Sequence, residues 1–195
     1  MEYIVGKPRF KHALFLGGSY IFIAFTLFLF DAWPLIRIVS AVLVVIVIFI
    51  TIPGISYSSL LWKVNDQYLE YTLHETFYEK IKAFYKHIFR THFLEYQIKL
   101  RLDQIDYITV TYAKLPKPPF GVFGYDVLFR VHMLDGSVFT FKSLVVMQHQ
   151  YFNQAVEYMK KKGIEFIDPY QILPVLYTNE HLSYYLEKLE KERGL

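Results

Sequence analysis

The chain of 195 residues contains no cysteine, which excludes disulfides, thiolate nucleophiles and cysteine-based zinc or iron–sulfur sites. Its net charge is only +3, and it has no internal repeat of solenoid length. The seven histidines are scattered without metal-ligand spacing, and no glycine-rich phosphate loop is present. No nucleophile–base–acid set can be named either. The sequence therefore predicts a protein that is not an enzyme and that uses no cofactor or metal.

Charge is also missing from two apolar runs, Ala13 to Phe30 and Ile38 to Ile52. The first is about 18 residues long and the second reaches about 19 when counted from Pro34, close to the roughly 20 residues of a membrane-spanning helix. Hydrocarbon requires paired backbone groups, so we expect helices despite the many β-branched side chains. Residues 13–56 are thus predicted to form a transmembrane hairpin. A cleaved signal peptide is the competing interpretation, but residues 28–33 offer no small-x-small cleavage site.

Positive charge is concentrated before the first run, at Lys7, Arg9 and Lys11. The turn between the runs offers only Arg37 against Asp31. The positive-inside rule then places both chain ends in the cytoplasm and predicts a two-pass protein of the cell membrane. Neither run carries an internal ionisable group, which argues against an ion pathway within a single hairpin.

After a break at Pro53-Gly54, the periodicity changes to that of short strands. Strands are expected over 61–64, 68–74, 96–102, 105–112, 127–134 and 138–141. Asn65-Asp66 and Asp135-Gly136 are turn pairs typical of β-hairpins. Amphipathic helices are expected over 146–162 and 179–192. The predicted organisation is a cytoplasmic N-terminal segment (1–12), the hairpin (13–56), a sheet domain (57–168) and a helical extension (169–195).

The segments "LRLDQIDYITV", "GYDVLFRVHMLDGSVFTFKS" and "MKKKGIEFI" follow one another in the order of strand, Asp-Gly hairpin and closing helix. In this order, residues 61–167 resemble the bacterial PH-like domains that are often attached to paired membrane helices. The resemblance implies an α+β membrane protein, with a pleckstrin-homology-like antiparallel sheet closed by a C-terminal helix. It also implies a link to the cell envelope, in some relatives to tolerance of membrane-active bacteriocins, and no agreed active site.

The segment from Phe77 to Phe93 has apolar residues at helical spacing, with basic residues between them. Such a basic, aromatic, amphipathic helix is typical of a segment lying in an anionic membrane interface. The candidate lipid contacts are Lys80, Lys82, Lys86 and Arg90. The alternatives are that the apolar face packs on the sheet or the hairpin and the lysines are only solvated, or that the helix binds a protein or nucleic-acid partner.

A second candidate is the Pro-rich stretch 114–124, which is expected to form a long loop between strands. Its lysines lie beside aromatic residues, a combination suited to dipping into a bilayer or to holding a partner. The candidate residues are Lys114, Lys117, Phe120 and Phe123. The alternative is that both aromatic rings fold back into the core.

Taken together, these features predict a non-catalytic, membrane-anchored binding or scaffolding protein whose cytoplasmic domain contacts anionic lipid or another membrane protein, and not nucleic acid. Two alternatives stay open. One is an accessory subunit of a membrane transport or cell-envelope assembly complex, and the other is a bacteriocin-immunity or envelope-stress protein. The oligomeric state, the lipid and the partner are not predicted.

Overall fold

The computed structural model describes residues 2–6, 8–30, 33–57, 62–73, 76–89, 96–117, 122–143, 149–178 and 181–193. The chain divides into two compact units, each discontinuous in sequence. The helical unit comprises Lys7–Ser59 and His74–Glu95. The sheet unit comprises Met1–Gly6, Leu60–Leu73 and Tyr96–Leu195. The fold is thus α+β, with two apolar helices near the N-terminus and antiparallel sheets followed by helices toward the C-terminus.

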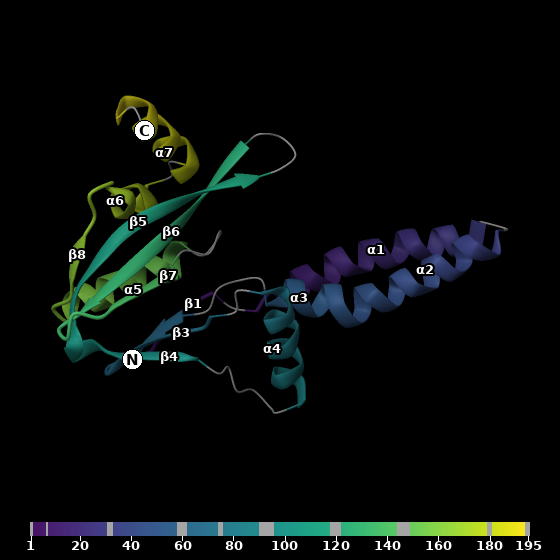
Figure 1. The fold of residues 1–195 in the computed structure, drawn as a ribbon, viewed down its shortest axis with the longest axis horizontal. Coiled ribbons are helices and arrows are strands. Elements are labelled where there is room, and N and C mark those ends of the chain that lie inside the picture. Colours follow the sequence, from purple (N-terminus) through teal and green to yellow (C-terminus); the bar gives the residue numbers. More distant parts are fainter. Residues whose placement is uncertain are drawn as a thin grey trace. The chain divides into compact units, whose positions relative to one another are not determined.

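The helical unit is built on α1 (Phe10–Phe30) and α2 (Pro34–Ile46), which lie side by side (Figure 1). A π-helical turn (Val47–Thr51) continues α2 into α3 (Ile52–Ser56). The ranges Phe10–Leu29 and Pro34–Ser56, 20 and 23 residues long, are long and apolar enough to cross a membrane. The predicted break at Pro53-Gly54 is wrong, because the helix continues to Ser56. The helix accommodates Pro53 because a π-helical turn, Val47–Thr51, shifts the backbone hydrogen-bond pattern just before it.

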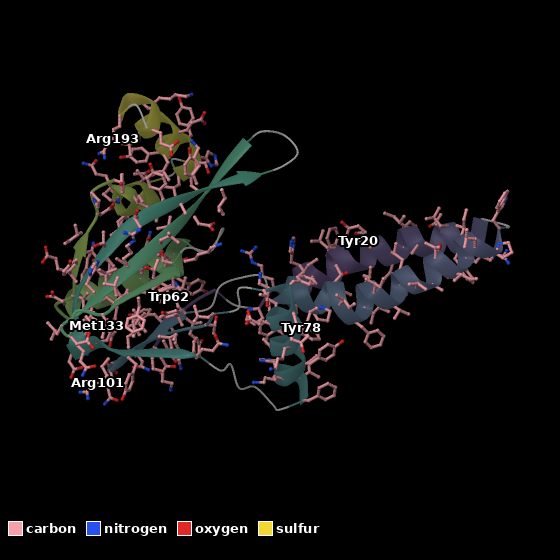
Figure 2. All side chains as sticks on the ribbon, in the orientation of Figure 1. Tyr20, Trp62, Tyr78, Arg101, Met133 and Arg193 are labelled. Atoms are coloured by element: carbon pink, nitrogen blue, oxygen red, sulfur yellow. The ribbon has the colours of Figure 1, made fainter. Side chains whose placement is uncertain are left out.

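Both long helices expose most of their apolar side chains (Figure 2). Phe15, Phe22 and Ile38 have exposed fractions of 74%, 71% and 62%, and Tyr20 also points outward. The contact side of α1 carries small residues, and Ala13 and Ala24 are buried there. Exposed apolar surfaces of this extent are typical of sites that contact a membrane or another protein.

The sheet unit contains two four-stranded sheets with the strand orders β1-β2-β3-β4 and β7-β6-β5-β8. The strands are β1 (Tyr3–Val5), β2 (Trp62–Val64), β3 (Tyr68–Tyr71), β4 (Ile98–Arg101), β5 (Ile105–Lys117), β6 (Val122–Met133), β7 (Val138–Lys142) and β8 (Glu165–Ile167). All pairings are antiparallel except that of β8, which runs parallel to β5. Both predicted hairpins are present, and Gly136 in the second turn has a φ of +84°, which favours glycine.

Three helices complete this unit: α5 (His149–Lys161), α6 (Ile172–Tyr177) and α7 (Leu182–Arg193). The core joins both sheets to α5 around Trp62, whose ring lies edge-on to Phe129, Phe141 and Phe152. The indole N–H of Trp62 donates to the Ser143 carbonyl at 2.7 Å. A single aromatic core therefore fixes the two sheets and α5 as one body.

The prediction of a long loop over residues 114–124 is wrong, because most of this stretch belongs to two paired strands. β5 continues to Lys117 and β6 begins at Val122, in unbroken register from Tyr107 onward. The strands extend because the alternation of apolar and polar residues runs past Tyr112, and the prolines fall near the strand end. Strands β1 and β8 and helix α6 were not predicted.

Candidate functional site: a basic aromatic helix at one end of the apolar hairpin

Helix α4 (Phe77–Phe89) begins at a capping box. The Thr76 backbone N–H donates to the Glu79 carboxylate at 3.0 Å, and the Glu79 N–H donates to the Thr76 hydroxyl at 3.2 Å. This reciprocal pair satisfies two backbone groups that a helix start otherwise leaves open. The T-x-x-E spacing of residues 76–79 is the sequence signal for this start. The helix predicted over 77–93 is confirmed for Phe77–Phe89, and residues 90–93 lie outside the described residues.

α4 is described in full, and none of its 13 side chains is buried. Four of its apolar or aromatic side chains are exposed: Phe77, Tyr78, Ile88 and Phe89, by 48%, 72%, 52% and 78%. A helix of a water-soluble domain normally buries its apolar stripe against the core. These four side chains form an exposed apolar surface on α4, of a kind that often marks a contact with a partner or a membrane.

The inner side of α4 packs against α3, within the helical unit (Figure 1). The Phe77 ring occupies the space beside Gly54, where a Cβ atom would overlap it. A second contact lies about one and a half helical turns before Gly54, in the π-helical turn. There the Phe49 carbonyl accepts a hydrogen bond from the Tyr85 hydroxyl of α4 at 3.0 Å. Two separate contacts thus fix α4 to the end of the second apolar helix.

An aromatic cluster joins α4 to both apolar helices at this same end. Phe84 and His87 lie 6.0 and 5.9 Å from Phe10 at the start of α1, measured between ring centroids. Both also lie close to Tyr57, at 6.3 and 6.1 Å. Burial raises the pKa of the Tyr57 phenol to about 12, so this hydroxyl stays neutral at physiological pH. The Arg9 N–H donates to the Ser56 carbonyl at 2.8 Å and closes the hairpin end.

Basic residues gather at this end of the helical unit. Arg9 and Lys11 precede or open α1, and Lys80, Lys82 and Lys86 lie on α4. Lys82 is exposed, and no carboxylate of the described residues forms an ion pair with Lys80 or Lys82. The other end of the hairpin offers only Arg37 among its described basic residues. The two ends of the helical unit therefore differ strongly in charge.

The remaining predicted site residues do not belong to this group. Arg90 and Phe120 lie outside the described residues, as do the side chains of Lys117 and Phe123. Lys114 lies on β5 in the sheet unit, where its ammonium is 2.6 Å from the carboxylate of Glu190 on α7. The structure thus places Lys80, Lys82 and Lys86 on the same helix, and it gives Lys114 an anionic partner within its own unit.

Glu190 is a polar centre that the sequence analysis missed. Its side chain is nearly buried, and it accepts hydrogen bonds from Lys114 and, at 3.2 Å, from the Tyr125 hydroxyl. The hydrogen bond from Lys114 lowers the pKa of Glu190, and the same bond raises the pKa of Lys114. Glu190 follows buried Leu186 by four residues, so it lies on the inner face of α7. This spacing is the sequence signal that could have predicted its inward position. The contact holds α7 on the β5–β6 hairpin.

Glu70 forms a second buried polar group, on β3. Lys63 and Lys99, its cross-strand partners, each place an ammonium 3.4 Å from its carboxylate. Cross-strand pairs of this kind stabilise a sheet and fix its register. Among the described residues, no group of three or more His, Asp or Glu side chains is arranged to hold a metal ion.

Comparisons with protein-family models, curated proteins and solved structures found no match to this chain.

Proposed function

We propose that the protein is a non-catalytic, membrane-anchored binding and scaffolding protein. In this proposal α1 and the continuous α2–α3 helix cross the bilayer, and α4 lies in the membrane interface and contacts anionic lipid. The length and composition of the two spans and their exposed apolar side chains support the anchor. The sheet unit is the binding or scaffolding module that this anchor keeps at the membrane.

The observation that carries the proposal is α4 itself. It combines seven large apolar or aromatic residues, none of them fully buried, with three lysines, and it is fixed to one end of the apolar hairpin. Interfacial helices have this composition, with an apolar side in the acyl boundary and basic residues among the headgroups. Each lysine near an anionic surface contributes about 1 kcal/mol, so Lys80, Lys82 and Lys86 together contribute about 3 kcal/mol of attraction.

The charge distribution supports a cytoplasmic position for this end of the hairpin. Arg9, Lys11 and the three lysines of α4 are all on that side, whereas Arg37 lies at the other end. Short segments rich in Lys and Arg next to a membrane helix remain in the cytoplasm. Anionic lipid is concentrated in the cytoplasmic leaflet, which is the surface that α4 would meet.

We also propose that the sheet unit has a PH-like plan. Two antiparallel sheets around one core, the Asp135-Gly136 hairpin and helix α5 after the last antiparallel strand support this. The additional strand β8, which pairs in parallel with β5, and the helices α6 and α7 go beyond that plan. The proposal for the fold is therefore an elaborated PH-like domain.

The test uses the full chain in nanodiscs. Because the chain has no cysteine, Ala83→Cys provides a single labelling site on α4 for an environment-sensitive fluorophore. Brominated phosphatidylglycerol is expected to quench this fluorophore more strongly than brominated phosphatidylcholine at equal mole fraction, with the difference decreasing as salt is raised. Replacing Lys80, Lys82 and Lys86 by Glu should remove the difference.

The control changes the same number of charges on exposed lysines of the sheet unit, by replacing Lys161, Lys188 and Lys191 with Glu. This variant should keep the preference for the anionic lipid. Equal quenching by both lipids in the unaltered protein would refute the lipid contact. The exposed face of α4 would then be assigned to another membrane protein, as expected for an accessory subunit.

A further inference from the structure

The carbonyl of Phe49 lies in the second apolar helix, four residues before Pro53. In an α-helix this carbonyl accepts the N–H of the residue four positions later, but proline has no N–H. The π-helical turn Val47–Thr51 ends two residues before the proline, and the Ile52 N–H donates to the Val47 carbonyl five residues back. Helix geometry therefore changes where the regular donor is missing.

Tyr85 of α4 supplies a donor at this point. Its hydroxyl lies 3.0 Å from the Phe49 carbonyl oxygen, and its ring packs edge-on to Phe84 and parallel to Phe89. In the proposed membrane setting, an unsatisfied carbonyl costs several kcal/mol, so a donor from a neighbouring helix matters more than it would in water. Tyr78, on the same helix, is 72% exposed and has no hydrogen-bond partner among the described residues.

We propose that Tyr85 is the positioning residue of the lipid-contacting helix: its bond to Phe49 fixes the depth and rotation of α4 in the interface. The inference rests on the proposed function, since it concerns how α4 meets the bilayer. Phe49 precedes Ser56 by seven residues, which places its carbonyl about 10 Å inward from the end of α3. Because consecutive helix residues are 100° apart, a fixed Tyr85 also fixes the directions of Lys82 and Lys86.

The first experiment measures amide hydrogen exchange of α4 in the full chain, in nanodiscs of neutral and of anionic lipid. Tyr85→Phe keeps the ring and removes only the donor. We expect it to lower the protection factors of α4 by about threefold to twentyfold, the range of single hydrogen bonds between membrane helices. Tyr78→Phe is the matched control and should leave protection unchanged. Equal effects of the two substitutions would overturn the inference.

A double-mutant cycle with Pro53→Ala then tests the proposed cause. Alanine restores an N–H at position 53, so the Phe49 carbonyl regains an intrahelical donor. In that background, Tyr85→Phe should lower the protection factors of α4 by less than half of the decrease, on a free-energy scale, that it causes in the unaltered chain. Additive effects of the two substitutions would show that Tyr85 acts for another reason and would refute the proposal.

A depth measurement separates positioning from general stabilisation. A nitroxide at Ala83→Cys is expected to change its accessibility to oxygen and to a water-soluble relaxation agent in Tyr85→Phe, and not in Tyr78→Phe. An unchanged depth would refute the positioning role. The two proposals can fail separately. If Tyr85→Phe changes protection and depth equally in neutral and anionic nanodiscs, the positioning role stands. If α4 at the same time shows no preference for anionic lipid, the headgroup contact of the proposed function fails.

Discussion

Two adjacent glycines of α1 provide a matched test of the hairpin. A Cβ atom at Gly17 would overlap the Cγ1 and Cδ1 atoms of Ile52, whereas a Cβ atom at Gly18 would meet nothing within 4 Å. Both residues lie in the interior of the same helix. Gly17→Ala and Gly18→Ala therefore share the gain in helix propensity, which is up to about 1 kcal/mol. The difference between the two variants isolates the packing of α1 against the second helix.

Overpacking a close contact costs about 1–3 kcal/mol. We expect Gly17→Ala to be less stable than Gly18→Ala by this amount, with Gly18→Ala equal to or slightly more stable than the unaltered protein. The assay is reversible unfolding in mixed micelles by increasing the mole fraction of a denaturing detergent, followed by far-UV circular dichroism.

A second substitution identifies the contact. Ile52→Ala removes both atoms that the added methyl group would overlap, so Gly17→Ala should cost little in that background, and the coupling should be about 1–2 kcal/mol. Equal unfolding free energies for Gly17→Ala and Gly18→Ala would refute the close approach of α1 to Ile52. Simple additivity of Gly17→Ala and Ile52→Ala would refute Ile52 as the contact.

Two predictions concern the sheet unit. Trp62→Phe should destabilise this unit by about 2–4 kcal/mol, because it leaves a cavity in the core and removes the donor to the Ser143 carbonyl. The control is Trp33→Phe, at an exposed position. Equal shifts of the thermal unfolding midpoint in the two variants would contradict the role of Trp62. Hydrogen bonds that Glu190 accepts from Lys114 and Tyr125 lower the pKa of its carboxyl group, so the ionised form stabilises the docking of α7 at neutral pH. This stabilisation should decrease as the pH falls below about 4.5, the ordinary pKa of the group. Hydrogen exchange of α7 should show this acid-dependent loss of protection, and Glu190→Gln should have lower protection at pH 7 and a flatter profile; a profile unchanged by the substitution would refute it.

Local patterns were sufficient to predict much of this fold. The apolar runs predicted the two long helices, and the Asp135-Gly136 pair with alternating apolar residues on both sides predicted the hairpin of β6 and β7. The spacing of aromatic and basic residues predicted α4. In each case the signal lies within about 20 consecutive residues, where helix and strand periodicities differ clearly.

Long-range pairings could not be predicted in the same way. Strand β1 has three residues, too few for any periodicity, and it pairs with residues 57 to 61 positions later. The contact between Lys114 and Glu190 joins residues 76 positions apart, so the sequence alone placed Lys114 among the candidate lipid or partner contacts. The residue pattern of α4 also predicted an apolar face, but it could not predict that Phe77 packs against Gly54 or that Tyr85 donates to the Phe49 carbonyl.

The pairing of β1 with β2 restricts how the chain can cross a membrane. Tyr3 to Val5 precede α1, and their partners, Trp62 to Val64, follow α3. Strands that share backbone hydrogen bonds must lie on the same side of a bilayer, so any crossings by the segment between them must be even in number. A single crossing by either apolar helix alone would separate the two strands. The sheet is therefore compatible with the proposed two-pass hairpin and incompatible with a single crossing, independently of the charge distribution.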